Sequence, residues 1–153
     1  MYSVDIVLHI NPPTTTAQSA SRIFRSRDGR LFIGKNRRSG RFATEWNTIE
    51  HQLTIHAPTQ PFVGAVHISV NIIYPWRSGE SLKVRAQGEI PKTTKPDLDN
   101  LAKYLLDLMQ RHGYYENDSQ ICELHLSKFW GDDPCIKISI KNYEKTVDSL
   151  TIQ

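Results

Sequence analysis

A length of 153 residues suits one domain with its own hydrophobic core, without disulfides or a structural metal. Hydrophobic residues make up 39% and charged residues 23%, values typical of globular proteins, which argues against a disordered or fibrous chain. No segment approaches the roughly 18 apolar residues of a membrane span, and the first residues lack the basic region of a signal peptide. We therefore expect a single domain over residues 1–153 that is cytoplasmic and not bound to a membrane.

The net charge of +3 is distributed unevenly along the chain. Between positions 22 and 41, eight basic residues accompany a single acid, Asp28, so this window carries +7 and the remainder −4. Clustered cations favour nucleic acids, because each cation placed on a phosphate releases condensed counterions. The alternative is a solvated basic loop, since three glycines interrupt the window. On charge alone, the candidate DNA contacts are Arg22, Arg25, Arg27, Arg30, Lys35, Arg37, Arg38 and Arg41.

The N-terminal part of the chain predicts a strand, a hairpin and a helix. Residues 4–10 alternate imperfectly and end at Asn11-Pro12-Pro13, which cannot continue a β-ladder, so a first strand is expected there. Asp28-Gly29 is a strong turn signal and predicts a basic β-hairpin over about 22–34. From 41 to 56, apolar residues recur every three or four positions, which indicates a helix.

The middle of the chain predicts a central strand, a long loop and a second helix. Residues 63–74 are rich in β-branched side chains that alternate with polar ones, which is typical of a half-buried strand. Residues 75–96 show little periodicity and predict a mobile loop of unusual length. A leucine repeat followed by Gly113 predicts a helix over 99–111.

Two final segments, 120–129 and 135–141, alternate apolar and polar positions and predict a closing hairpin. The order of elements indicates an α+β (mixed α/β) fold in which two helices pack on a small mixed β-sheet. The cysteines, Cys122 and Cys135, lie in these strands without the spacing of metal ligands, so no zinc site is expected.

The segment from Lys95 to Lys103 carries the candidate catalytic residues. Proline disfavours the helical region for the residue before it, so the chain arrives extended, and Asp97 and Asp99 can point to the same side. Two adjacent carboxylates repel one another unless a cation lies between them. Mg²⁺ is the natural candidate because it prefers oxygen ligands, and Lys103 lies one helical turn after Asp99, within reach of a phosphate.

The same residues also have purely structural interpretations. Asp99 is a favoured helix N-cap, Asp97 suits the positive end of a helix, and Asp99 with Lys103 could be a surface ion pair. A convincing metal site needs a third acid, and Glu116-Asn117-Asp118 offers candidates after the helix. A helix of about 20 Å separates the two segments, and Asn-Asp is a common turn pair, so spacing does not place Asp118 beside Asp97.

Together these motifs resemble those of the RusA-type endodeoxyribonucleases. Residues 96–103 read P-D-L-D-N-L-A-K, Leu106-Asp107-Leu108 continues the helix, and residues 113–121 form an aromatic turn followed by an acid and Gln-Ile. The close likeness covers residues 96–140, whereas the N-terminal half matches more loosely, through the proline-led turn at Asn11-Pro12-Pro13-Thr14.

The resemblance implies a nuclease that uses Mg²⁺, with Mn²⁺ able to substitute, and that acts as a homodimer on four-way (Holliday) junctions in DNA recombination and repair. It assigns the metal to Asp97, Asp99 and Asp118 and a catalytic role to Lys103. The resemblance therefore implies that the fold brings Asp118 close to the other two acids. The family often has two aspartates at the last site; Asn117 stands first here, so only Asp118 is carried over. The alternatives are a less selective branched-DNA nuclease, a non-catalytic junction-binding module and a metal-dependent transferase.

Overall fold

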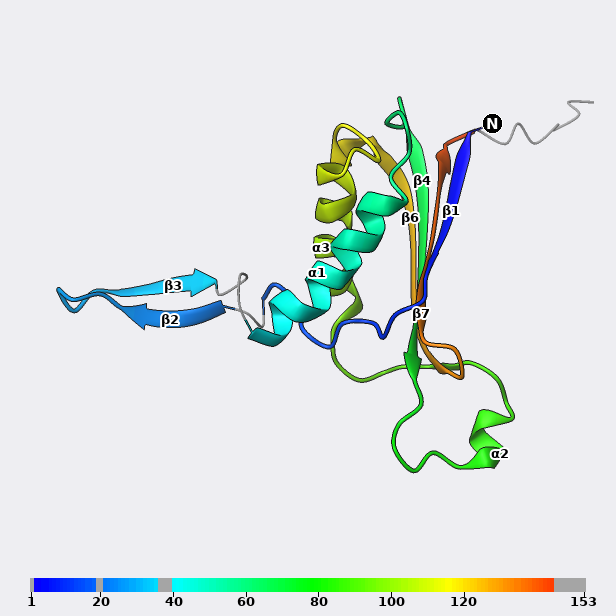
Figure 1. Cartoon of the computed structure of the whole chain (residues 1–153), viewed down its shortest axis with the longest axis horizontal. Helices are drawn as coiled ribbons and strands as arrows, with labels where there is room; N and C mark the ends of the chain where they lie inside the picture. The colour runs from blue at the N-terminus through cyan, green and yellow to red at the C-terminus, as the bar shows by residue number, and fades with distance from the viewer. Residues whose placement is uncertain (1, 19–20, 36–39, 145–153) are drawn as a thin grey trace, which may run out of the picture.

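The computed structural model describes residues 2–18, 21–35 and 40–144, and at positions 21, 22 and 35 it describes only the backbone. Two helices, α1 (Gly40–Ile55) and α3 (Leu98–Arg111), lie side by side on one face of a five-stranded sheet, as Figure 1 shows. A short third helix, α2 (Leu82–Arg85), lies beyond one end of the sheet. This arrangement confirms the predicted α+β class with two helices packed on a small mixed sheet.

The sheet is built around one long central strand. Across the sheet the order is β1 (Ser3–Leu8), β7 (Cys135–Asn142), β4 (Val66–Pro75), β6 (Ile121–Gly131) and β5 (Ile90–Pro91). β6 runs parallel to β4, whereas the other neighbouring strands are antiparallel. β4 therefore has a long strand on each side, which matches its prediction as a central strand.

The predicted closing hairpin is wrong, because β6 and β7 do not pair with each other. β4 lies between them, and its Ile73 is opposite Phe129 of β6 on one side and Cys135 of β7 on the other. The connection therefore crosses the end of β4, a span of two strand spacings or about 10 Å, which residues 132–134 can bridge. Alternation identified both strands correctly, but it carries no information about which neighbour each strand takes.

The hydrophobic core lies between the two long helices and the sheet. In the leucine repeat of α3, Leu101, Leu105 and Leu108 are fully buried and Leu98 is partly buried, and Tyr104 of α3 packs edge-on against Trp46 of α1. Alternate residues of β4 supply the opposite wall; they are Val66, Ile68, Val70 and Ile72. Among the described residues, none of the helices has the length and apolar character that crossing a membrane requires.

The segment 75–96 is more ordered than the predicted loop. Ser81 caps α2 by accepting a hydrogen bond from the Val84 backbone N–H at 3.3 Å. Ile90 and Pro91 form β5 at the edge of the sheet, a place where a proline is tolerated because one side of the strand needs no donor. The sequence missed both elements because each is shorter than the periodicity that would reveal it.

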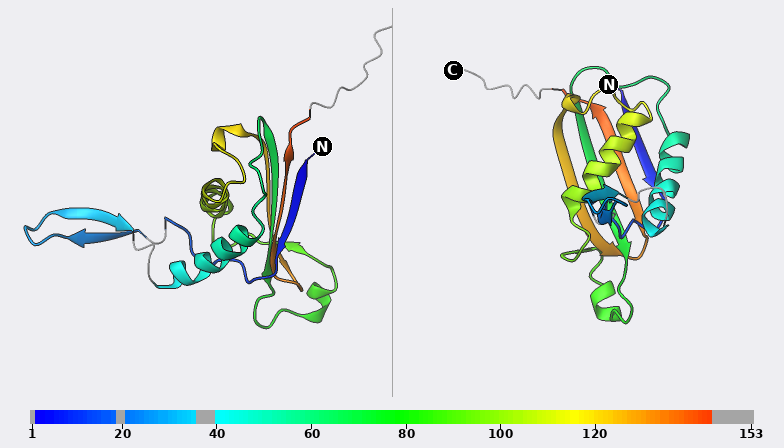
Figure 2. Two further views of the ribbon diagram at one scale, coloured as in Figure 1. Left: turned by 45° about the horizontal axis from the view of Figure 1, so that its top comes forward. Right: turned by 90° about the vertical axis from the view of Figure 1, so that its left-hand side faces the viewer.

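The predicted basic hairpin is confirmed and stands apart from the rest of the fold. β2 (Ser21–Arg25) and β3 (Leu31–Lys35) pair only with each other, and they extend away from the helices in Figures 1 and 2. The turn is closed by the Gly29 N–H donating to the Ser26 carbonyl at 2.9 Å, with Gly29 at a φ of 84°. Such a positive φ suits glycine, in agreement with the Asp-Gly signal.

Candidate active site and nucleic-acid interface

Asp97 and Asp99 stand at the start of α3 with their side chains exposed. Asp97 is the N-cap residue in an extended conformation, and its side chain makes no capping hydrogen bond. Leu98, between them, packs against the core, so the two acids face away from it as predicted. Two of the structural interpretations do not hold, because the N-cap is Asp97 and not Asp99 and no ion pair joins Asp99 to Lys103 in the described chain. The third remains, since Asp97 does lie at the positive end of the helix. Both carboxylates are free to bind a cation.

The loop that leads into this acid pair is held by Lys128 from a distant strand and by Lys92, which lies a few residues earlier in the chain. Lys128 of β6 donates to the carbonyls of Thr94 at 2.7 Å and Pro96 at 2.6 Å. Lys92 donates to the Lys95 carbonyl at 2.7 Å and also bonds to Thr94. Because carbonyl oxygens on the loop accept these bonds, the two ammonium groups fix the backbone just before Asp97.

These lysines also set the electrostatics beside the acids. Burial lowers the pKa of Lys128, and the nearby charge of Asp97 acts in the opposite direction. Burial and neighbouring cations lower the pKa of Lys92, whose amine lies over the ring of Trp130 at 4.1 Å and that of Tyr74 at 5.0 Å. Neither lysine forms an ion pair with a carboxylate among the residues that the structure describes. Two weakly compensated positive charges therefore lie next to the acid pair, where a phosphate would be favoured.

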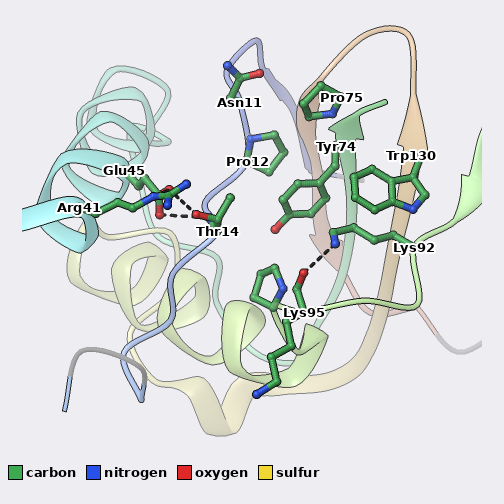
Figure 3. A pocket seen from close by; sticks show the side chains of 11 residues that line it. Asn11, Pro12, Thr14, Arg41, Glu45, Tyr74, Pro75, Lys92, Lys95 and Trp130 are labelled. Carbon is green, nitrogen blue, oxygen red and sulfur yellow. Dashed lines mark hydrogen bonds and ion pairs between the residues drawn. The ribbon is translucent and has the colours of Figure 1, made fainter. Parts of the chain in front are cut away.

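A pocket of about 440 Å³ opens beside this loop, and Figure 3 shows its lining. One wall is Lys92, Tyr74 and Trp130, and the facing wall comes from the proline-led turn after β1 and the first turn of α1. Glu45 of α1 fixes that turn by accepting hydrogen bonds from the backbone and hydroxyl groups of Thr14 and Thr15. The volume lies within the usual range of small-ligand sites, about 300–1,000 Å³. Sequence reasoning missed this pocket because five separate segments build it.

Asp118 lies beyond the other end of α3. It opens a short 3₁₀ helix (Asp118–Gln120) that Asn117 caps by accepting from the Ser119 backbone N–H at 2.9 Å. Burial, together with the charges of Asp118 and Asp107, raises the pKa of Tyr115, which places both acids near that hydroxyl. Asp107 is eight residues after Asp99, or about 12 Å along the helix. Within one chain, then, the structure does not bring Asp118 to the other two acids.

The structure does assemble a different group of possible metal ligands. His67, Glu123 and His125 have ligand atoms within 4.8 Å of one another, and they are the one such group of three in the described parts of the chain. Glu123 accepts from His67 at 2.9 Å and from His125 at 2.8 Å, and these two bonds lower its pKa. The group lies on the sheet face opposite the helices, because His67 alternates with buried residues of β4. This group is therefore separate from the acid pair, and no local sequence motif predicted it.

The basic residues divide into those on the hairpin and one at the pocket. Arg25, Arg27 and Arg30 are exposed on the hairpin, where Arg30 also contacts Asp28 at 3.4 Å. Arg41 begins α1, contacts Glu45 at 3.1 Å and lines the pocket. Arg22 and Lys35 belong to β2 and β3, but only their backbone is described, and Arg37 and Arg38 lie outside the described residues.

Comparison with known proteins assigns the chain to a family. The sequence model of the family described as Endodeoxyribonuclease RusA matches residues 12–141. A Lactococcus phage r1t protein named Crossover junction endodeoxyribonuclease rusA is 31% identical over 107 residues, which cover 70% of this chain and 79% of that protein. The Uncharacterized protein YqaN of Bacillus subtilis (strain 168) is 32% identical over 91 residues, 56% of this chain and 63% of that protein.

The chain therefore belongs to the RusA endodeoxyribonuclease family, as its motifs indicated. The match begins at Pro12, so it includes the N-terminal half in which the motifs alone matched loosely. The matched region spans less than two thirds of the length of YqaN.

Proposed function

We propose that the protein is a metal-dependent endodeoxyribonuclease that resolves four-way DNA junctions by paired symmetric nicks, in the cytoplasm, during recombination and repair. The observation that carries the proposal is the exposed pair Asp97 and Asp99, whose carboxylates neither cap the helix nor form ion pairs in the described chain. Membership of the RusA family supports it, as do the two lysines that fix the loop beside the pair without an ion pair to a carboxylate in the described chain.

The residues of this pair suit Mg²⁺, because Mg²⁺ prefers carboxylate oxygens and keeps several waters, which exposed side chains permit. When bound, Mg²⁺ or Mn²⁺ would polarise a phosphoryl oxygen and lower the pKa of a bound water. Asp97 and Asp99 would hold the ion. Lys103, exposed one turn further along α3, would donate to a phosphate oxygen and stabilise the charge that develops there.

We further propose a homodimer in which Asp118 of a second copy completes the site. Asp118 is exposed, its turn is fixed by the Asn117 cap, and about 12 Å or more of helix separates it from Asp99 in its own chain. A two-fold dimer would place each Asp118 opposite the acid pair of the other copy and would present two sites to two strands. The paired nicks of a resolvase require two such sites.

Cleavage of a labelled four-way junction and of its matched linear duplex in Mg²⁺ tests the proposal. We expect paired symmetric nicks in the junction alone, and their loss in Asp99→Asn while junction binding persists. Asp133→Asn is a matched control, since it removes an exposed acid on the turn before β7 and should cleave normally. Junction binding without cleavage in Mg²⁺ or Mn²⁺ would instead identify a binding module. Nicks in flaps and forks as well as junctions would identify a less selective branched-DNA nuclease.

A further inference from the structure

The hairpin of β2 and β3 exposes an unusual amount of apolar surface for a segment so rich in arginine. Ile23 and Ile33 are 73% and 75% exposed, Leu31 is 66% exposed, and Phe32 is 52% exposed. These side chains contribute nothing to the core, because the hairpin pairs only with itself and extends away from the helices (Figure 2). Contiguous exposed apolar residues of this kind mark an interaction surface.

Both faces of the hairpin carry this apolar surface. The cross-strand pair Ile23 and Ile33 lies on one face, and Phe24 and Phe32 lie on the other with their rings stacked at 5.7 Å. Gly34 permits this arrangement, because a Cβ there would meet the Phe24 ring at 2.6 Å. An isolated two-stranded hairpin is marginally stable in water, so a partner that covers both faces would stabilise it.

The charge around the apolar side chains favours a polyanionic partner. Arg25, Arg27 and Arg30 are exposed at and beside the turn, and one acid, Asp28, accompanies them. Packing two copies of this hairpin against each other would bring like charges together, which is unfavourable. DNA satisfies both features, because phosphates attract the arginines while apolar side chains can enter between base steps and unstack them.

We propose that this hairpin is a wedge that enters the centre of a branched DNA junction. Its arginines contact the phosphates of the surrounding strands, and its two apolar faces pack against the base pairs that border the branch point. A linear duplex offers no such opening without the cost of unstacking its bases. The wedge thus supplies selectivity for branched DNA, whereas the acid pair supplies cleavage; the inference rests on the proposed junction-resolving function.

The test uses the full-length protein in EDTA with a four-way junction that carries 2-aminopurine beside the branch point. Wild type should raise the 2-aminopurine fluorescence as the bases unstack. Ile23→Thr/Ile33→Thr removes apolar surface and keeps β-branched side chains that favour a strand. In this variant we expect the fluorescence rise to be lost and the junction-to-duplex affinity ratio to fall by about 10-fold or more, because the apolar side chains that enter between base steps offset the cost of unstacking them.

Two control variants distinguish a loss of base unstacking by the hairpin from a general loss of DNA affinity or stability. Val63→Ser changes a side chain that is 79% exposed away from the hairpin, and it should leave fluorescence and selectivity unchanged. Arg27→Gln/Arg30→Gln should weaken junction binding and reduce its salt dependence, while the fluorescence rise at saturating protein persists, because phosphate contacts supply affinity and the apolar side chains unstack the bases. Thermal unfolding should match wild type in all of these variants, since none of the changed residues belongs to the core.

Each outcome bears on the inference in a distinct way. If wild type prefers junctions but Ile23→Thr/Ile33→Thr keeps both the fluorescence rise and the selectivity, the wedge is overturned and the resolvase proposal stands. If the double variant changes the sedimentation of the protein and leaves the DNA signals unchanged, the surface binds a second copy and the wedge is again overturned. If wild type shows no preference for junctions, the proposed function itself fails.

Discussion

The two ends of helix α3 carry acids of one family motif in different surroundings. At its start, Asp97 and Asp99 are exposed and uncommitted, and two lysines from outside the helix fix the loop that presents them. At its far end, Asp118 lies in a turn that Asn117 caps locally and that Gln120 anchors to the rest of the fold, because its amide donates to the Phe62 and Gly64 carbonyls at 3.0 and 2.9 Å. Both ends are therefore fixed by long-range as well as local bonds, but in the described chain cationic side chains fix the start alone. In the proposed homodimer, each chain would supply two separate parts of the metal site, with the acid pair of one copy facing Asp118 of the other.

The largest expected effect tests whether those two parts belong to different copies. Asp99→Asn and Asp118→Asn should each lower junction cleavage about a thousandfold, because several kcal/mol of transition-state stabilisation depend on the metal ligands. A mixture of the two variants, refolded together to exchange subunits, should recover cleavage. A mixed dimer would contain one intact site, made of Asp99 from one copy and Asp118 from the other, and one site lacking both.

The form of the products sharpens this test. The mixture should yield single nicks, since a mixed dimer has one working site, whereas wild type should yield paired nicks. Asp99→Asn mixed with itself under the same refolding conditions is the control and should stay inactive. An inactive mixture in which mixed dimers are demonstrated by mass spectrometry would place all three acids in one copy and contradict the division between the two ends of α3.

The next largest effect concerns the loop at the start of the helix. Lys128→Met should lower cleavage about 10-fold to 100-fold, the usual result of removing a group that orients a metal ligand. The Thr94 and Pro96 carbonyls would lose their donor, and the position of Asp97 would become less defined. The activity should be partly restored by higher Mg²⁺ concentrations. Lys137→Met, which changes an exposed lysine on β7, is the control and should retain activity.

The difference between the two ends also explains what the sequence could predict. The exposure of Asp97 and Asp99 followed from local rules, namely the extended arrival after Lys95 and the leucine repeat that turns Leu98 inward. The contact of Lys128 with Thr94 joins residues 34 positions apart, and only the tertiary fold creates it. Local sequence patterns therefore predicted the position of the two acids but not the lysines that fix the loop before them.

Strand pairing was unpredictable for a similar reason. Alternation shows which side chains of a strand are buried, but the neighbours of a strand depend on packing across the whole sheet. The predicted pairing of β6 with β7 failed on this point. For the same reason the sequence did not reveal the His67–Glu123 contact, which needs β4 and β6 to lie side by side. The elements themselves were predicted well because their periodicity is local.

A third prediction concerns pH and the turn that borders the pocket at the start of α3. Burial acts to raise the pKa of Glu45, but hydrogen bonds from Thr15, Thr14 and Arg41 outweigh it and lower the pKa below its ordinary 4.5. A lowered folded-state pKa gives stability that is present above pH 4.5 and is lost as the pH falls through the folded value. Glu45→Gln should therefore have a lower Tm than wild type at pH 7.

The measurement that checks this prediction is the pH dependence of the Tm difference between wild type and Glu45→Gln. The Tm values of wild type and Glu45→Gln should converge as the pH falls from 5 towards 3, because the wild-type carboxylate becomes protonated in this window. Glu80→Gln is a useful control, since Glu80 contacts Arg77 far along the chain from this turn. A constant Tm difference between wild type and Glu45→Gln over the whole range would show that shape, and not charge, accounts for the role of Glu45.

The smallest expected effect tests the Asn117 cap of the turn beyond the far end of α3. Asn117→Ala removes a cap and should lower the free energy of unfolding by about 1 kcal/mol, which corresponds to a Tm decrease of about 2–4 °C. Cleavage should fall because Asp118 loses its defined position, while Mg²⁺ binding by Asp97 and Asp99, measured by calorimetry, should stay as in wild type. If Asn117→Ala weakened Mg²⁺ binding as much as Lys128→Met, Asp118 would contribute as much to metal affinity as the loop at the start of α3. Unchanged Mg²⁺ affinity together with reduced cleavage would instead mean that Asp118 acts on a metal already held by the other end of the helix.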